Sequence, residues 1–584
     1  MTTEFDAPPP SVPLDEIADA AAQLFGTAID PTAPATVLPS ERDQNVRIGS
    51  VVVKVSNAAE DPSSLDFQAY VLGHLEHAEP SVPVPRLLEP GVVRHRFSTG
   101  EHAVRSVTWL EGIPFAEAMR TADAAGAAVL RRSLGTVMGR LSTALLTAAH
   151  PAAGRPAFLW DLDRAQAVRQ WLGDIADSEV RQTAAAVLDR HERHVVPRLG
   201  SLRRAIVHHD ANDYNVLADG SRVSGIIDFG DMLESSQVNE LAVALAYALL
   251  DAPDVIAAAH DVISPYTAEF ALLDDELSVL WELVATRLAM SIAISSHRSA
   301  AFPDNDYLLV SQAPAARLLQ RLVAIRPDQL HFAARHAARL EPVPAGRAVR
   351  TWLASPQLRV VDPLPVDLAT APTVLFSLAD GAPATQFPSG PQGAHAAWEW
   401  MRSEITAHGA AVGLGAYDED RSCYAGDQFA TDAPEPRSVH LGIDVFVEAG
   451  TPVHVPLDGI VETVADNDMS FDYGPTVIVR HATDDGTDFW SLYGHLSRRT
   501  IDIVRPGDHV PAGSTIGSVG HPEENGGWAP HVHVQVMTSL LTARWGRADA
   551  EPEGNFEGAG EPSRMDVWRS IVPNPSALLR LPPR

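Results

Sequence analysis

Apolar and polar residues alternate in short runs through the first part of the chain. Three runs are rich in β-branched residues and predict strands, because such side chains fit a pleated sheet surface: 46–56, 92–96 and 103–110. A helix is expected at 65–76, since this stretch follows the turn-forming sequence Asp61-Pro62-Ser63-Ser64. Residues 15–27 have the spacing of a short amphipathic helix. Residues 1–115 are therefore predicted to form a small sheet lobe.

The periodicity changes after this lobe. Long stretches with helical spacing, rich in Ala and Leu, fill 116–338, and only 205–231 interrupts them with a compact β-rich patch. Residues 339–392 are rich in Pro, Ala and Gly and predict a linker with one short strand at 373–378. Short strands between Gly, Pro and Asp turns then dominate 393–584. We expect a multidomain protein: a small β lobe plus a helical lobe, as in the α+β fold of kinases, then an all-β domain.

The composition is that of folded globular domains, with 45% hydrophobic and 20% charged residues among 584. The 75 acidic residues outnumber the 44 Lys and Arg residues, which gives a net charge of −31. A surface this acidic repels phosphate backbones and anionic lipids, so nucleic acid and membranes are poor candidate partners. Cys423 is the only cysteine, which excludes an intrachain disulfide and a multi-cysteine metal site.

The N-terminal sequence has neither the basic start nor the apolar core of a secretory signal. No uninterrupted apolar stretch reaches the length that spans a bilayer. We therefore expect a cytoplasmic protein.

Lys54 is the only lysine of the chain, and all other basic side chains are arginine or histidine. Nucleotide bias towards arginine codons explains the many arginines but not the single exception. A compact ammonium and a planar guanidinium are not interchangeable where a phosphate needs a point charge. Lys54 lies inside the apolar run 51–55, whereas a chance survivor is more expected on a solvated loop. This position predicts a phosphate-binding role for Lys54.

Two acidic motifs follow, HHDANDYN at 208–215 and IIDFGD at 226–231. Phosphoryl transfer needs a carboxylate that orients or deprotonates the attacking hydroxyl, oxygen ligands for magnesium, and a cation on the remaining phosphate charge. Asp210 fits the first task, Asn215 and Asp228 fit the second, and Lys54 fits the third.

This order of motifs resembles the aminoglycoside phosphotransferase and choline kinase superfamily. The loop SERDQN at 40–45 and the sequence Asn239-Glu240-Leu241-Ala242 are similar to its hydroxylysine kinase branch. The resemblance spans about 30–335. It implies ATP or GTP with Mg²⁺ as cofactor and a small-molecule substrate.

The resemblance also implies roles for individual residues. Asp210 corresponds to the catalytic base, Asn215 and Asp228 to Mg²⁺ ligands, and Lys54 to the residue on the nucleotide phosphates. The hinge that contacts the nucleotide base corresponds to a short segment: Thr108, Trp109 and Leu110.

Two features depart from the kinase pattern. Many kinases pair the strand lysine with a glutamate on the following helix, but here that helix reads Leu65-Asp66-Phe67-Gln68. The sequence therefore leaves open which residue supports Lys54. The loop 40–45 contains no glycine, unlike the glycine-rich loop of protein kinases, which favours a small-molecule substrate over a protein.

A second set of candidate residues lies in the C-terminal part, in the sequences HLGID at 440–444, YGH at 493–495 and HVH at 531–533. Residues two apart in a strand point to the same face, so His531 and His533 are expected to project together. Two imidazoles and a carboxylate form a nitrogen and oxygen site, and three protein ligands leave the open position of a catalytic zinc. An open zinc lowers the pKa of bound water or polarises a carbonyl or phosphoryl oxygen.

The ordered set resembles the lysostaphin-like zinc metallopeptidases over about 395–545, and turn sequences such as Arg505-Pro506-Gly507-Asp508 are similar too. The resemblance implies three Zn²⁺ ligands: His440, Asp444 and His533. It also implies two residues that assist proton transfer or stabilise the oxyanion beside the zinc-bound water: His495 and His531.

Together the resemblances imply a nucleotide-dependent kinase that phosphorylates a hydroxyl of an amino alcohol or hydroxy-amino acid. We expect the zinc domain to act on the same or the phosphorylated molecule, by hydrolysis, elimination or cyclisation. Two alternatives stay open. In the first, the second domain is a non-catalytic binding or oligomerisation module. In the second, the protein is a cytoplasmic zinc peptidase that its kinase-like domain regulates.

Bacterial fusions with a similar domain order carry a pyridoxal-phosphate aminotransferase or phospholyase as a third domain. This similarity implies an aminotransferase-type partner domain or protein. Beyond Lys54, the chain holds no lysine that could form a pyridoxal Schiff base, so pyridoxal phosphate is not expected in this chain.

Overall fold

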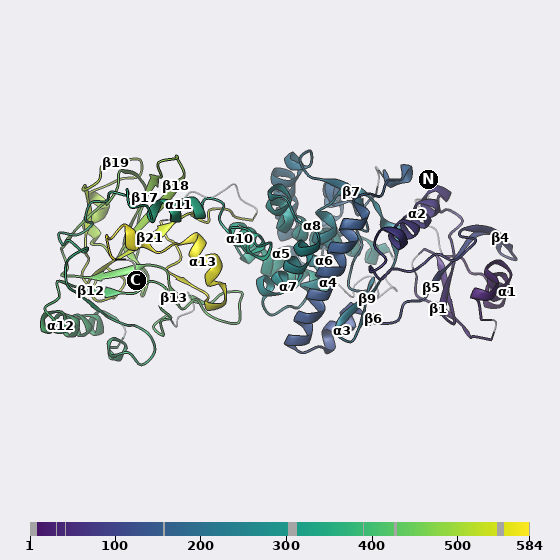
Figure 1. Ribbon diagram of the computed structural model, residues 1–584, viewed down its shortest axis with the longest axis horizontal. Helices are drawn as coiled ribbons and strands as arrows, with labels where there is room; N and C mark the ends of the chain where they lie inside the picture. Colours follow the sequence, from purple (N-terminus) through teal and green to yellow (C-terminus); the bar gives the residue numbers. More distant parts are fainter. Residues whose placement is uncertain are drawn as a thin grey trace. The chain divides into compact units, whose positions relative to one another are not determined.

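The computed structural model describes residues 9–30, 32–40, 42–155, 158–301, 312–388, 390–424, 429–545 and 554–582. Contacts divide the chain into two compact units, Met1–Ala324 and Ile325–Arg584. Figure 1 colours the first unit from purple to teal and the second from teal to yellow. Glu41, a member of the predicted loop 40–45, lies outside the described residues.

The first unit begins with a five-stranded antiparallel sheet in the order β1-β2-β3-β5-β4. Its strands are β1 (Ala35–Leu38), β2 (Gln44–Ile48), β3 (Val51–Val55), β4 (Val93–Phe97) and β5 (Gly100–Thr108). The run expected as one strand at 46–56 is divided between β2 and β3, because Gly49 turns the chain there with φ +60°.

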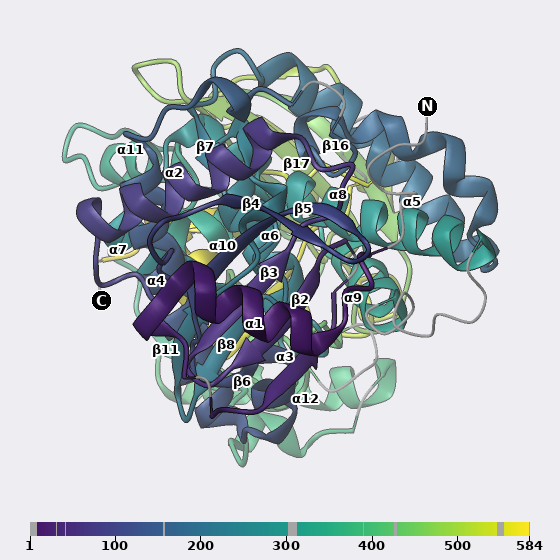
Figure 2. The same ribbon diagram turned by 90° about the vertical axis from the view of Figure 1, so that its right-hand side faces the viewer.

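Two helices accompany this sheet. Helix α1 (Leu14–Phe25) lies against β2 and β3 (Figure 2). On its apolar face, Ile17 and Phe25 join Val46 and Val53 in one buried cluster. Helix α2 (Pro62–Ala78) begins after Asp61, whose carboxylate accepts a hydrogen bond from the Ser63 amide at 2.9 Å. The predicted small sheet lobe is present.

The rest of the first unit is mainly helical. Its helices are α3 (Phe115–Thr121), α4 (Ala124–Leu145), α5 (Ser178–Arg190), α6 (Asn239–Ala248), α7 (Val255–Glu269), α8 (Asp274–Ala301) and α9 (Gln312–Ala324). The β-rich patch supplies two small sheets, formed by β6 (Ile113–Pro114), β8 (Val216–Asp219) and β9 (Arg222–Ile226), and by β7 (Arg204–Val207) and β10 (Leu233–Ser236). These short strands hold the two acidic motifs between them.

Helix α8 is the one helix within the described ranges that is long and apolar enough, by length and composition, to cross a membrane. Of its apolar window, 94% is buried inside the protein. A core helix of this length passes the same compositional test, and α8 packs on α6 and α5 as such a helix does.

An eight-stranded sheet organises the second unit, in the order β11-β12-β14-β21-β18-β17-β16-β19. Its strands are β11 (Thr373–Leu375), β12 (Val412–Gly415), β14 (Ile443–Phe446), β16 (Gly459–Asn467), β17 (Gly474–Ala482), β18 (Asp488–Gly494), β19 (His509–Val510) and β21 (His531–Met537). Two short pairs complete the β structure, β13 (Val439–His440) with β22 (Ala559–Gly560) and β15 (Pro452–His454) with β20 (Thr515–Ser518).

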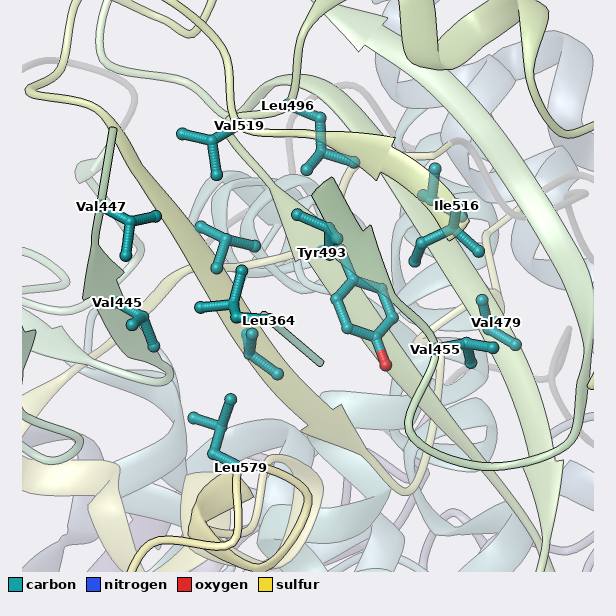
Figure 3. Close-up of a cluster of buried hydrophobic side chains, with 14 of the residues drawn as sticks. Leu364, Val445, Val447, Val455, Val479, Tyr493, Leu496, Ile516, Val519 and Leu579 are labelled. Atoms are coloured by element: carbon teal, nitrogen blue, oxygen red, sulfur yellow. The ribbon is translucent and has the colours of Figure 1, made fainter. Parts of the chain in front are cut away.

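Buried aliphatic residues and one buried tyrosine form one of the core clusters of this unit (Figure 3). Tyr493 of β18 is fully buried among valines of the neighbouring strands. Leu364 and Leu579, which lie far from each other in the sequence, close the same cluster. The strands that carry the candidate zinc ligands therefore rest on a rigid, apolar base.

The structure differs from the predicted boundaries in the middle of the chain. The contact boundary lies after Ala324, before the expected linker 339–392. Helices α10 (Pro327–Ala337) and α11 (Gly346–Leu353) lie in the second unit, where Val349 and Leu353 pack against Phe489 and Val536. This segment is packed chain because its apolar residues have helical spacing despite the many prolines.

The second unit is β-rich but not all-β. Helix α12 (Pro391–Ala407) stands inside the region expected to contain strands, and α13 (Met565–Ile571) follows near its end. In α12, Ala397 and Met401 are buried with Phe376 and Phe446, so the helix covers one end of the sheet. Apart from these helices, the two-part architecture expected from the sequence is confirmed.

Candidate active sites

The segment between β7 and β8 places Asp210 and Asn215 side by side. The Asn215 side-chain amide donates to the Asp210 carboxylate at 2.6 Å and to its backbone carbonyl at 3.0 Å. Asn212 donates to the same carboxylate oxygen at 3.1 Å. Because both donors of Asn215 point to Asp210, its Oδ1 atom is left as an acceptor, which is the group that a hard cation such as Mg²⁺ requires.

Arg287 of α8 is the main partner of Asp210 that the sequence did not reveal. Its Nη2 lies 2.7 Å from Asp210 Oδ1, and its guanidinium is buried against the Trp160 ring at 4.5 Å. Burial raises the pKa of Asp210 to about 7, although Arg287 opposes the rise. One signal was available, since Arg287 is the only charged residue between Leu283 and Ser296.

Asp228 stands at the start of the second motif with its backbone in the left-handed region, at φ +63°. Its carboxylate accepts a hydrogen bond from the Gly230 amide at 3.2 Å. Desolvation opposes its charge, but Lys54 and Arg42 lower the pKa of Asp228 below its ordinary value. Asp228 is therefore ionised at neutral pH and is exposed to solvent.

His208 joins the two motifs. Its Nε2 donates to the Ile227 carbonyl at 3.0 Å, its Nδ1 accepts from the Asp210 amide at 3.3 Å, and its ring contacts Phe229 edge-on at 4.7 Å. Glu240 at the start of α6 is fully buried and accepts from the His208 amide at 2.5 Å. Burial raises the pKa of Glu240 to about 7. Glu240 therefore supports the backbone of the first motif.

Lys54 of β3 is partly buried and electrostatically close to Asp228. The Asp228 carboxylate acts to raise the pKa of Lys54, and the Lys54 ammonium acts to lower the pKa of Asp228. Arg42, from the glycine-free loop, forms an ion pair with Asp231 at 2.5 Å. The charge of Asp228 also raises the pKa of Asp210. The four residues predicted for phosphoryl transfer are therefore brought together in one site.

The predicted hinge follows β5 directly. The amides of Thr108 and Trp109 donate to the carbonyls of Arg86 and Ser50 at 2.9 and 2.8 Å, so neither is open to a nucleotide base. The Trp109 ring lies under the Arg47 guanidinium at 4.0 Å. Base contacts from this segment, including Leu110, stay a prediction.

The second site forms where β13, β14 and β21 meet. The ligand atoms of His440, Asp444 and His533 all lie within 4.8 Å of one another, and all three side chains are buried. His533 Nδ1 lies 2.8 Å from Asp444 Oδ1 and 3.0 Å from His440 Nε2. The pairing of β14 with β21 sets Asp444 directly opposite His533.

Hydrogen bonds on the far side of each ring test whether a metal fits. His440 Nδ1 donates to the Ala416 carbonyl at 2.7 Å, and His533 Nε2 donates to Gln535 Oε1 at 2.9 Å. These bonds leave lone pairs on His440 Nε2 and His533 Nδ1, which face each other beside a carboxylate oxygen. Three acceptor atoms with no proton between them repel one another, so the set fits a cation such as Zn²⁺.

His495 and His531 lie beside this ligand set, with ring centroids 4.2 Å apart. Their Nδ1 atoms donate to the carbonyls of Asn525 and Ala529 at 2.8 and 2.6 Å. Burial lowers the pKa of both imidazoles, and the neighbouring histidines lower that of His495 further. Each neutral ring therefore keeps Nε2 as an acceptor, which is suited to take a proton.

Arg421 is a second residue that the motifs did not reveal. Its Nη1 donates to Asp444 Oδ2 at 2.8 Å and its Nε donates to Glu419 at 3.0 Å, while its side chain is 3% exposed. A Cβ atom at Gly415 would lie 2.8 Å from Arg421 Nη2 and 2.9 Å from Asp444 Oδ2. The small residue on β12 therefore makes room for this ion pair.

A pocket of about 530 Å³ opens over the site. His495, His531, His533 and Asp444 line it together with residues far outside the motifs: Phe387 and Pro388 before α12, Ala397 and Met401 on α12, Tyr424, Phe429, and Phe556 near β22. Its volume is in the range of small-molecule binding sites.

Comparisons with known proteins agree with these two sites. Residues 36–272 match the phosphotransferase enzyme family, and residues 438–543 match peptidase family M23. The chain is 26% identical over 343 residues to hydroxylysine kinase of Danio rerio, covering 55% of this chain and 94% of that protein. It is likewise 26% identical over 335 residues to hydroxylysine kinase of Mus musculus, covering 51% and 86%.

Two further similarities concern one part of the chain each. An uncharacterized metalloprotease of Haemophilus influenzae is 35% identical over 96 residues, which cover 16% of this chain and 18% of that protein. The solved structure of a microcompartment-associated aminopropanol kinase covers 53% of this chain and 97% of its own, with 18% identity and a TM-score of 0.41.

Fold and site together define a two-lobed phosphotransferase followed by a metallopeptidase-like β domain. The model of the phosphotransferase enzyme family matches one part of the chain, and the model of peptidase family M23 matches another.

Proposed function

We propose that the first unit transfers the γ-phosphoryl group of ATP or GTP to a hydroxyl of an amino alcohol or hydroxy-amino acid. The convergence of Lys54, Asp210, Asn215 and Asp228 is the observation that carries this proposal. Similarity to hydroxylysine kinases over almost their whole length supports the substrate class. Because the reaction consumes a nucleoside triphosphate, we place it in the cytoplasm.

In this proposal Asp210 takes the proton of the attacking hydroxyl. A base with a pKa of about 7 is well matched to this task at neutral pH. Asn215 and Arg287 hold the carboxylate from two sides, which fixes its direction. Lys54 would bind the nucleotide phosphates.

Asp228 and the Oδ1 atom of Asn215 would hold Mg²⁺. The ion neutralises phosphate charge and aligns the leaving group when bound. The ionised carboxylate of Asp228 and the acceptor left on Asn215 fit this role.

A product assay tests the proposal. The protein is incubated with Mg²⁺, ATP or GTP, and a panel of amino alcohols and hydroxy-amino acids, and product masses are followed. We expect a phosphate monoester of one panel member, and Asp210→Asn should reduce its formation by about 10² to 10⁴-fold. Equal product with Asp210→Asn would contradict the assignment of the base.

We further propose that the second unit is a zinc-dependent enzyme that acts on the same molecule or its phosphate ester. His440, Asp444 and His533 would hold the ion, which polarises a substrate oxygen or activates water when bound. The volume of the pocket, about 530 Å³, supports a small-molecule substrate. His495 and His531 would exchange protons with the substrate through Nε2.

His440→Ala separates the two activities. With the true kinase substrate, wild-type protein should give a final product that differs from the simple phosphate ester, and the variant should accumulate the ester. A zinc chelator should reproduce the effect. The same final product from both proteins would exclude this role. Peptide cleavage that survives Asp210→Ala would instead favour a peptidase that the first unit regulates.

An aminotransferase-type partner stays part of this proposal. A partner that binds pyridoxal phosphate would have to supply its own lysine, because Lys54 lies in the phosphotransferase site. Co-purification of the natural protein followed by mass spectrometry would test for it.

A further inference from the structure

The charges of Asp228 and Asp43 act on Lys54, but neither carboxylate pairs with it directly. Within the described part of the chain, its ammonium donates no hydrogen bond and joins no ion pair. Yet it is partly buried, and its direct neighbours across the sheet are Asn45 on β2 and Arg105 on β5. Like charges directly opposite each other in a sheet are unfavourable, so this arrangement needs an explanation.

The helix that follows the lysine strand presents an amide where kinases commonly present a carboxylate. Gln68 of α2 is 7% exposed, and its Oε1 accepts a hydrogen bond from Arg105 Nη2 at 3.1 Å. An amide carries no charge, so Gln68 does not neutralise Lys54.

Arg105 forms hydrogen bonds with three separate segments of the sheet lobe. Its side chain is buried, and its Nη1 donates to Ser56 Oγ at 2.5 Å. Its Nη2 also donates to Asp43 Oδ2 at 3.0 Å, and Asp43 belongs to the loop 40–45. One guanidinium therefore links the end of β3, helix α2 and the glycine-free loop.

We propose that Arg105 is a positioning residue that takes over the structural half of the usual lysine–glutamate pair and leaves Lys54 free for the nucleotide phosphates. Arg105 takes Asp43 and Gln68 as its own hydrogen-bond partners, so Lys54 is left without a direct ion pair until the phosphates bind. This inference rests on the proposed kinase function.

The inference makes Gln68→Glu informative. The new carboxylate would stand beside Arg105, which lies directly opposite Lys54 in the sheet, and would add a negative charge near both cations. Because the nucleotide must then displace a charge, affinity for ATP or GTP should fall about tenfold, which corresponds to about 1.4 kcal/mol. Gln68→Leu is the matched control: it removes the same hydrogen bond without adding charge and should change affinity less than about threefold.

Arg105→Met tests the same idea from the other side. Without the guanidinium, Asp43 is released and can pair with Lys54, so nucleotide KM should rise about tenfold with a smaller change in kcat. The double variant Arg105→Met with Asp43→Asn removes the competing carboxylate and should restore most of the affinity. A residue that only stabilised the fold would not be rescued in this way.

Direct binding of the non-hydrolysable analogues of ATP and GTP, in Mg²⁺, is measured on the full chain for all variants. Thermal unfolding shows that each variant is folded. Gln68→Glu binding as tightly as wild type, or no rescue of Arg105→Met by Asp43→Asn, would overturn the inference. Wild-type protein that binds neither analogue would instead contradict the proposed kinase function, so the two failures are distinguishable.

Discussion

Arg287 and Asp210 form an ion pair in which the guanidinium is buried, with Arg287 Nη2 at 2.7 Å from Asp210 Oδ1, across 77 residues of sequence. The pair connects the central helix α8 to the loop that carries the proposed base. The carboxylate is thereby held by groups from two separate elements, Arg287 on one oxygen and Asn215 on the other.

Arg287→Met should lower kcat about 10- to 100-fold, because the base loses the donor that fixes its direction. Nucleotide KM should change little, since the contacts of Arg287 are with Asp210 and Trp160 and not with the lysine strand. Steady-state kinetics with the substrate found in the panel assay measure both values. Arg287→Lys keeps the positive charge but lacks the planar guanidinium, so its kcat should lie between those of wild type and Arg287→Met. Unchanged kcat in Arg287→Met would show that the pair is structural only.

The pH profile of the kinase should reflect the raised pKa of Asp210, about 7. A base must be deprotonated to accept the hydroxyl proton, so kcat/KM should rise with pH through about 7 and level off above it. The profile is measured at saturating Mg²⁺ with a buffer series of constant ionic strength. A profile that stays flat from about pH 5.5 to 8 would contradict the assignment.

Gln535→Leu should weaken zinc binding about 10- to 100-fold, because His533 loses the acceptor that fixes its tautomer. Competition with a coloured chelator measures the affinity without any enzymatic assay. Tyr473 donates to the same amide oxygen at 2.5 Å, so Tyr473→Phe is the matched control and should have a smaller effect. Equal affinity in Gln535→Leu and wild type would argue against this second layer of contacts.

Arg421→Met should destabilise the second unit more strongly without zinc than with it. The substitution leaves the carboxylates of Asp444 and Glu419 without their guanidinium, which costs about 3–5 kcal/mol when no other cation is near. Bound zinc would balance the negative charge of Asp444, so the loss of stability should be smaller when zinc is present. Urea unfolding of the full chain, with and without zinc, measures the difference in the second unit's transition. The same loss in both conditions would show that Asp444 does not face the ion.

The sequence by itself was enough to predict the two-part architecture and the motifs from which the two candidate sites are built. Short-range sequence spacing was enough to predict these motifs. Alternation along a strand places His531 and His533 on one face, and turn-forming residues mark the short motifs 208–215 and 226–231. The single lysine was likewise visible without coordinates, since its uniqueness does not depend on packing.

Only the tertiary structure decided which distant residues complete the sites. Arg287 reaches Asp210 from a helix, Arg421 reaches Asp444 across β12, and Arg105 takes Gln68 and Asp43 as partners. None of these pairs has a fixed sequence spacing, because each depends on how separate elements pack. For the same reason the stretch 339–392, polar and proline-rich by composition, could not be seen as packed chain until its helices met the second sheet.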